Sequence, residues 1–389
     1  MSSSTPGSPF PGWTANKPWK RLRSSRSCAL TPFDSFKNPD LCRALLGKLE
    51  AALDKPMRFM EVCGTHTVAI FHSGLHSLLP SQLVHLTGPG CPVCVTHESE
   101  VAAFIELAGK DGVIVATFGD LMKVPGPGGA NLKKAQAEGA RVEVVYSPFD
   151  ALALARDNPA SKVVFLGVGF ETTAPAVAAT VKIAREQKLD NFLLLSFHKL
   201  VPPALRALLA DPFMSIEAFL LPGHVSAIIG LAAYKFIEDY HVPAVIAGFE
   251  PVDILTSLLL MVEQRKKGEA KVVNGYPRVV PDAGNPKALA TMYEVFKTSD
   301  ALWRGIGAIP DSGLVLADAY AQCDAFKVLD ITLKESKPLP GCRCGDVLKG
   351  ILKPNECPLY KKVCTPANPV GPCMVSTEGS CAAYYKYQL

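Results

Sequence analysis

The chain has 389 residues, a net charge of +4 and 48% hydrophobic residues. This composition excludes a disordered chain as the overall state, and so mild a charge gives no support for nucleic-acid binding. No apolar run approaches the ~18 residues of a membrane span. Twelve cysteines in a long chain without a signal peptide indicate metal or redox chemistry in a reducing, cytoplasmic compartment.

The first segment, residues 1–35, predicts a disordered tail. It is rich in Ser and Pro and carries five basic residues before its first acid, Asp34. It lacks the apolar stretch of a secretory signal, and an organelle transit peptide is the alternative interpretation.

Beyond the tail, a helix is expected over residues 39–53. Short apolar runs then alternate with segments of helical period, and the runs span residues 58–62, 83–86, 112–118, 141–146, 162–167, 192–197, 218–221 and 244–247. Runs of this kind are typical of parallel strands that are buried on both faces. The alternation predicts an α/β fold. One barrel or one large sheet remains possible, but a weak break near residues 157–162 favours two parallel-sheet domains with a cleft between them.

The predicted domains are residues 36–150 and 151–275, both α/β, followed by a helical or irregular domain over 276–389. Turn residues become frequent from about residue 271, and a helix is expected near 287–297. After residue 337 the chain is dominated by Cys, Pro and Gly. Such a segment cannot build a large apolar core, so another device must hold it together.

Chemically active residues follow the predicted strands repeatedly. In parallel sheets, ligands bind beyond the carboxyl ends of the strands, so a shared cleft is expected there. The segments concerned are Cys63-Gly-Thr-His66, Gly88-Pro-Gly-Cys-Pro-Val-Cys94, Phe118-Gly-Asp120, Gly169-Phe-Glu-Thr-Thr-Ala-Pro175, Ser196-Phe-His-Lys199, Pro222-Gly-His-Val-Ser226 and Gly248-Phe-Glu-Pro251.

Two of these segments carry cysteines. Cys91 and Cys94 form a C-x-x-C unit that opens a helix, where helix amides lower thiol pKa values. A redox dithiol is favoured over half of a zinc site or two structural cysteines. Cys63 and His66 are three residues apart at a strand-to-helix turn, so both side chains can face one metal or substrate. The alternative is a buried cysteine beside Thr65 as a helix cap.

The other segments give weaker signals. Glu171 at a sheet edge predicts an acid/base group or a ligand, whereas Thr172 or Thr173 is explained as a helix cap. A single histidine, such as His198 or His224, is more often a satisfied polar residue than a ligand.

The last 49 residues contain six of the twelve cysteines. Cys357, Cys364, Cys373 and Cys381 are separated by 7, 9 and 8 residues, which suits a [4Fe-4S] cluster better than the close pairs of zinc sites. Zinc and disulfides remain the alternatives. Cys342 and Cys344 form a C-x-C unit, for which a supporting or redox role is expected.

Taken together, these motifs resemble the HypD family of [NiFe]-hydrogenase maturation proteins. The resemblance rests on the CGTH, GPGCPVC, GFETTAP and PGHVS motifs and on the cysteines from Cys342 to Cys381, and it extends from about residue 36 to the C-terminus. It implies two α/β domains and a smaller domain with a [4Fe-4S] cluster. It also implies a scaffold, shared with the small partner HypC, on which an Fe(CN)2CO unit is assembled. Cyanide would arrive through HypE and HypF, and the hydrogenase large subunit would receive the iron.

The resemblance also implies roles for individual residues. Cys63 would hold the iron with a partner cysteine, assisted by Thr65 and His66, and Cys91 and Cys94 would be the exchanging dithiol. The four last cysteines would bind the cluster. Other side chains at the cleft rim would tune or protonate the cyanide and carbonyl ligands of the iron. These side chains are Asp120, Glu171, His198 and His224, with Thr172, Thr173 and Ser226 as further candidates.

Two other functions compete with this interpretation. A [4Fe-4S]-dependent thiol-disulfide oxidoreductase would use the same cluster and dithiol to turn over a protein disulfide. A zinc-stabilised interaction protein would use the cysteines without redox chemistry. The resemblance favours a redox-active assembly scaffold over a conventional turnover enzyme.

Overall fold

The computed structural model describes residues 34–212, 214–337 and 340–387. The predicted tail therefore lies, up to residue 33, outside the described residues. Among the helices within these ranges, none combines the length and the apolar character needed to cross a lipid bilayer.

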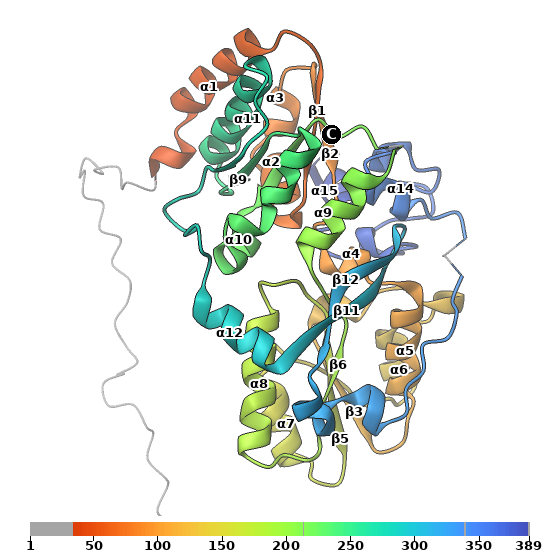
Figure 1. The fold of residues 1–389 in the computed structure, drawn as a ribbon. Helices are drawn as coiled ribbons and strands as arrows, with labels where there is room; N and C mark the ends of the chain where they lie inside the picture. Colours follow the sequence, from red (N-terminus) through yellow and green to blue (C-terminus); the bar gives the residue numbers. More distant parts are fainter. Residues whose placement is uncertain (1–33, 213, 338–339, 388–389) are drawn as a thin grey trace, which may run out of the picture.

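Two parallel sheets form the framework (Figure 1). Sheet A has the strand order β10-β9-β8-β1-β2, and sheet C has the order β4-β3-β5-β6. The strands of sheet A are β1 (Met57–Glu61), β2 (Leu83–Thr87), β8 (Ala218–Pro222), β9 (Ala244–Ala247) and β10 (Val272–Asn274). Those of sheet C are β3 (Val113–Thr117), β4 (Val142–Val144), β5 (Lys162–Gly167) and β6 (Phe192–Ser196).

Apolar helices cover both sheets. On one face of sheet A, Leu49 of α1 and Leu258 of α11 pack with Phe59 of β1. On one face of sheet C, Val181 of α8 packs with Phe165 of β5. The other faces of the two sheets contribute to one large core. The helices up to α11 are α1 (Pro39–Ala52), α2 (Gly64–His72), α3 (Leu75–Leu78), α4 (Pro92–Val95), α5 (Glu98–Ala108), α6 (Leu132–Ala137), α7 (Asp150–Asp157), α8 (Ala174–Glu186), α9 (Val201–Ala210), α10 (Gly223–Ile229) and α11 (Pro251–Lys266).

An antiparallel hairpin connects the parallel sheets to the cysteine-rich region (Figure 1). It follows α12 (Pro286–Val295) and consists of β11 (Phe296–Trp303) and β12 (Gly307–Leu316), and β12 also pairs with the short strand β7 (His198–Lys199). At its tip, Gly305 approaches Gly345 so closely that a Cβ on Gly305 would lie 2.1 Å from the Gly345 Cα.

The cysteine-rich region packs against the first α/β elements. Its helices are α13 (Ala325–Val328), α14 (Cys344–Leu348) and α15 (Ser380–Tyr387). Phe71 of α2 and Tyr384 of α15 belong to one small apolar core, with their ring centroids 4.5 Å apart. The last turns of the chain are thereby fixed beside the helix that follows Cys63.

The α/β class and the two parallel sheets are confirmed, and each of the eight predicted runs overlaps with a strand. The assignment of strands to domains differs from the predicted partition. Strands β1 and β2 from residues 36–150 pair in the sheet of β8 to β10, whereas β3 and β4 pair with β5 and β6 from residues 151–275. The chain changes sheets after β2 and returns after β6, and a local apolar pattern carries no information about which sheet a strand joins.

Candidate functional site

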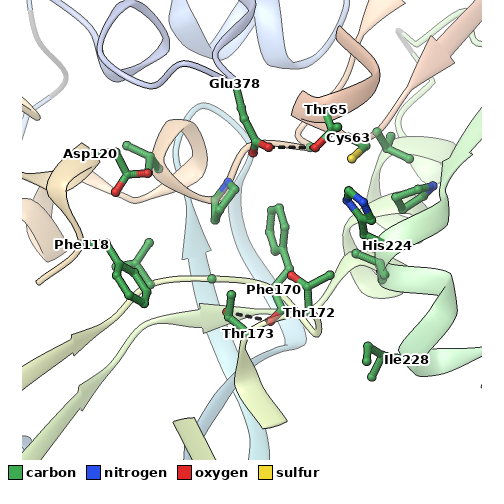
Figure 2. A pocket seen from close by; sticks show the side chains of 18 of the residues that line it. Cys63, Thr65, Phe118, Asp120, Phe170, Thr172, Thr173, His224, Ile228 and Glu378 are labelled. Atoms are coloured by element: carbon green, nitrogen blue, oxygen red, sulfur yellow. Dashed lines mark hydrogen bonds between the residues drawn. The ribbon is translucent and has the colours of Figure 1, made fainter. Parts of the chain in front are cut away.

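A cavity of about 490 Å³ lies where the carboxyl edges of both parallel sheets meet. Figure 2 shows the side chains that line it, which come from loops after strands of sheet A, from loops after strands of sheet C and from the cysteine-rich region. Residues that follow β1, β2 and β8 face residues that follow β3 and β5. The cavity is therefore the predicted cleft between two α/β units.

Cys63 lies in this cavity, between the end of β1 and the first turn of α2. Its backbone is still extended, and the helix begins at the next residue, Gly64. The side chain is almost buried, with 8% exposed. Burial, reinforced by the carboxylate of Glu378, raises the pKa of the Cys63 thiol to about 12. A metal ion that displaces this proton would gain a thiolate ligand in a largely water-free position.

A buried carboxylate at the end of β1, which sequence reasoning did not select, fixes the backbone at Cys63. Glu61 is 1% exposed, and its Oε2 accepts the Cys63 N–H at 2.9 Å. Its Oε1 accepts the Thr67 hydroxyl at 2.5 Å, and the His85 Nε2 lies 3.8 Å from the same atom. An acid at the end of an apolar strand is the signal that identifies such a residue, because a buried carboxylate requires specific partners.

The cysteine-rich region contributes a second carboxylate that the sequence analysis missed. The Thr65 hydroxyl donates to Glu378 Oε1 at 2.8 Å, and both residues line the cavity (Figure 2). Gly64 makes this contact possible, because a Cβ there would lie 2.5 Å from the Glu378 Cβ. The sequence separation of 313 positions between Thr65 and Glu378 explains why no local pattern pointed to this contact.

Cys91 and Cys94 are joined by a disulfide at the start of α4, with their Cα atoms 5.2 Å apart. Both are buried, with 3% and 0% exposed. The segment is tightly packed against Cys63, since the Gly64 N–H donates to Gly90 O at 3.0 Å and a Cβ on Gly90 would lie 2.1 Å from the Cys63 nitrogen. Pro92 and Val93 of this turn form part of the cavity wall. The structure thus brings the C-x-x-C segment next to Cys63.

Several predicted rim residues do line the cavity, namely Thr65, Asp120, Thr172, Thr173 and His224. Desolvation raises the pKa of Asp120 and lowers the pKa of His224. The His224 ring stacks on Phe249, with centroids 4.0 Å apart. Together with Glu378, these residues give the cavity two carboxyl groups, one imidazole and three hydroxyl groups.

Three other predicted site residues, His66, Glu171 and Ser226, lie outside the cavity lining and make local hydrogen bonds. His66 Nε2 donates to Gly248 O at 2.9 Å, and burial lowers the His66 pKa to about 4. Glu171 Oε1 accepts the first amide of α9, from Val201, at 2.9 Å. The Ser226 hydroxyl donates to Pro222 O at 2.7 Å.

His198 is also outside the cavity lining. It is 1% exposed, its Nδ1 lies 3.2 Å from Ser196 Oγ, and burial lowers its pKa to about 3. The physical reason is common to these residues. A side chain in the loop after a parallel strand points either into the shared space or back beneath the sheet edge, and the residue type does not decide which.

The six C-terminal cysteines converge on one pocket. Cys344 Sγ and Cys373 Sγ lie 2.7 Å apart, and a Cβ on Gly371 would lie 2.5 Å from Cys342 Sγ. The residues that line this pocket include Cys342, Cys344, Cys357, Cys364, Cys373 and Cys381, and no Asp, Glu or His. Within the described ranges, no group of three or more His, Cys, Asp or Glu residues is gathered closely enough to hold a single metal ion. An all-thiol lining fits a [4Fe-4S] cluster, whose irons each take one cysteine.

The chain is similar to known proteins over most of its length. A family model named HypD and described as "Hydrogenase formation hypA family" matches residues 40–388. The chain is 46% identical, over 91% of its length and 97% of the relative, to the Hydrogenase maturation factor HypD of Escherichia coli (strain K12). It is 44% identical to the protein of the same name from Rhodobacter capsulatus, over 90% and 97% of the two chains. It is 42% identical to Hydrogenase maturation factor HypD2 of Bradyrhizobium diazoefficiens, over 91% and 96%.

Proposed function

The chain belongs to the HypD family, and from this premise we propose that it is a hydrogenase maturation factor that holds iron while an Fe(CN)2CO unit is assembled. Cys63 anchors the iron as cargo, and a small HypC-type partner supplies a second cysteine. HypE-type and HypF-type proteins supply cyanide, and the hydrogenase large subunit receives the product.

The observation that carries this proposal is the position of Cys63 in the cavity between the two sheets. Cyanide and carbon monoxide favour low-spin Fe(II), for which a thiolate is a suitable anchor. Buried protein walls exclude water, while the open side of the cavity admits a partner. Asp120 and His224 at the rim are positioned to hold or release protons near the bound ligands.

The C-terminal cysteines support a [4Fe-4S] cluster as the resident cofactor. We assign Cys357, Cys364, Cys373 and Cys381 as its ligands, with Cys342 and Cys344 as supporting thiols in the same pocket. When bound, the cluster supplies single electrons at a controlled potential. Val93 of the C-x-x-C turn lines the Cys63 cavity, so a change between disulfide and dithiol occurs beside the anchor thiol.

The oxidoreductase alternative is less well supported. A thiol that turns over a disulfide of another protein must expose its sulfur to attack. Cys91 is 3% exposed and Cys94 is fully buried. A dithiol in this position serves an internal redox step better than exchange with a protein substrate.

Complementation of a cell that lacks its own HypD tests the proposal. The Cys63→Ala variant is expected to abolish hydrogenase maturation, because the anchor is lost. The matched control is Cys42→Ala on α1, a cysteine that lines neither the cavity nor the cysteine pocket, and it should retain full maturation. Full maturation with Cys63→Ala would contradict the proposed anchor.

A further inference from the structure

A lysine groove of about 830 Å³ lies between the segment around α6 and the loop at residues 367–370 of the cysteine-rich region. Lys123, Lys133 and Lys134 line one part of it, and Asn368 and Val370 line another. The groove shares no lining residue with the Cys63 cavity. It is therefore a separate surface, to which the proposed function assigns no role.

The charge of this groove is one-sided. All three lysines are exposed, and no Asp or Glu belongs to the lining. Within the part of the chain that the structure describes, none of the three forms an ion pair, and the Lys134 ammonium donates to Gly129 O at 2.8 Å. Three cations without carboxylate partners attract an acidic surface and accelerate its encounter with the protein.

The groove is directly connected to the cysteine pocket. The Val370 N–H in its wall donates to Cys364 Sγ at 3.3 Å. Cys364 lines the pocket that contains all six C-terminal cysteines. A protein seated in the groove therefore contacts a residue that is hydrogen-bonded to one of the proposed cluster ligands.

We propose that this lysine groove is the docking site of an acidic one-electron carrier protein that reduces the [4Fe-4S] cluster. The inference rests on the proposed function, which places the cluster at these cysteines. In the transfer the carrier loses one electron and the oxidised cluster gains it, and no covalent bond forms or breaks. The lysines hold the carrier, and the short distance through Val370 favours transfer at this surface.

Other occupants fit the charge less well. The N-terminal segment of this chain carries five basic residues and no acid before Asp34, so the lysines repel it. A second copy of the chain has a net charge of +4, which also opposes association here. An acidic partner satisfies the three cations, and only a redox partner makes use of the connection to Cys364.

The test uses the full chain, purified anaerobically, and a reduced acidic ferredoxin as the probe. The groove variant is Lys123→Glu/Lys133→Glu/Lys134→Glu. The matched control is Lys48→Glu/Lys55→Glu/Lys267→Glu, which changes three exposed lysines near α1 and α11 and alters the net charge equally. Binding is measured at low and high salt, and cluster reduction is followed by stopped-flow absorbance.

The groove variant is expected to bind the ferredoxin at least tenfold more weakly at low salt and to be reduced at least tenfold more slowly. The control should stay within about twofold of the wild type, and high salt should remove the difference between them. Equal effects of both variants, or no effect of the groove variant, would overturn the inference. So would a groove variant that loses the small HypC-type partner and keeps the ferredoxin.

Iron and acid-labile sulfide are measured on the same samples. A wild-type chain that contains neither would contradict the cluster, and with it both the proposed function and this inference. If the wild type and the groove variant both contain a full complement of iron and sulfide and bind ferredoxin equally well, this inference alone is contradicted.

Discussion

Two carboxylates border Cys63 from opposite ends of the chain. Glu61 holds the Cys63 backbone amide, and Glu378 holds the hydroxyl of Thr65 two residues further on. Both contacts fix the turn that carries the thiol, whereas the sulfur itself stays in the cavity. Cys63 is thus positioned through its backbone, which leaves its side chain available for the proposed role as iron anchor.

Replacing Glu61 tests this positioning role. Glu61→Leu leaves the buried Cys63 N–H and Thr67 hydroxyl without their acceptor, at a cost of about 2–5 kcal/mol in the free energy of unfolding. Glu61→Gln keeps an acceptor oxygen and is expected to recover most of that loss. Denaturant unfolding measures the stabilities, and the Leu variant should also carry less iron at Cys63 than the Gln variant. Equal stability and iron content in both variants would contradict the role.

Glu171 predicts a pH dependence of stability. Burial raises the pKa of Glu171 to about 7, above its ordinary value near 4.5. Between these two values the folded chain keeps a proton that the unfolded chain releases. The free energy of unfolding therefore falls as the pH rises from 4.5 to 7, by up to about 3 kcal/mol from this group.

Glu171→Gln cannot titrate and should remove that part of the decline, as measured by unfolding at a series of pH values. Exposed Glu50→Gln on α1 is the control and should leave the profile unchanged. A profile of Glu171→Gln that matches the wild type would show that the buried carboxyl does not carry the effect.

For individual residues, sequence patterns predicted which side chains are chemically active better than they predicted what surrounds those side chains. The sequence alone identified the important cysteines as candidates, because C-x-x-C spacing and isolated cysteines are uncommon. These are Cys63, Cys91 and the C-terminal cysteines. Glu61 and Glu378 carry no motif, and their importance comes from burial and from a contact across 313 residues. His66, by contrast, carries a motif, and yet its ring bonds a backbone carbonyl outside the cavity lining.

Among the secondary-structure elements, the β11–β12 hairpin connects the two cysteine-bearing regions. The Arg304 N–H donates to Val95 O at 3.0 Å, immediately after the C-x-x-C unit. On its other side, Gly305 has a φ of +73° and touches Gly345, next to Cys344. The hairpin tip is therefore wedged between the disulfide segment and the cysteine pocket.

Gly305→Ala is expected to separate the hairpin from the cysteine pocket, because the new Cβ would lie 2.1 Å from the Gly345 Cα. Gly307→Ala is the matched control, since Gly307 also has a positive φ, +105°, but a Cβ there meets nothing within 4 Å. The Gly305 variant should lose at least about 2 kcal/mol more stability than the control and should label faster at Cys342 with a thiol reagent. Equal losses and equal labelling would contradict the wedge.

The buried parallel strands were predictable because continuous apolar runs leave few other structures open. The pairing of these strands was not predictable, since β2 and β3 have similar apolar sequences and yet belong to different sheets. The hairpin escaped prediction for a different reason. Most of β11 is at least partly exposed and contains polar residues such as Lys297 and Asp300. Its sequence lacks a clear alternation of apolar and polar residues.

For the whole molecule, three regions meet around one thiol. Sheet A contributes Cys63 and His224, sheet C contributes Asp120 and Thr172, and the cysteine-rich region contributes Glu378. Beneath the same cavity wall lies the Cys91–Cys94 disulfide. This arrangement places the proposed iron anchor, the Cys91–Cys94 disulfide and the proposed cluster ligands in one connected structure.

The infrared spectrum of the protein, purified anaerobically with its small HypC-type partner, tests the central claim most directly. Cyanide and carbonyl bound to iron absorb where proteins are silent. The wild type should show bands of both ligands, and Cys63→Ala should lose them while it keeps the iron and sulfide of the C-terminal cysteines. The same bands at full intensity in Cys63→Ala would contradict the claim that this cysteine holds the iron.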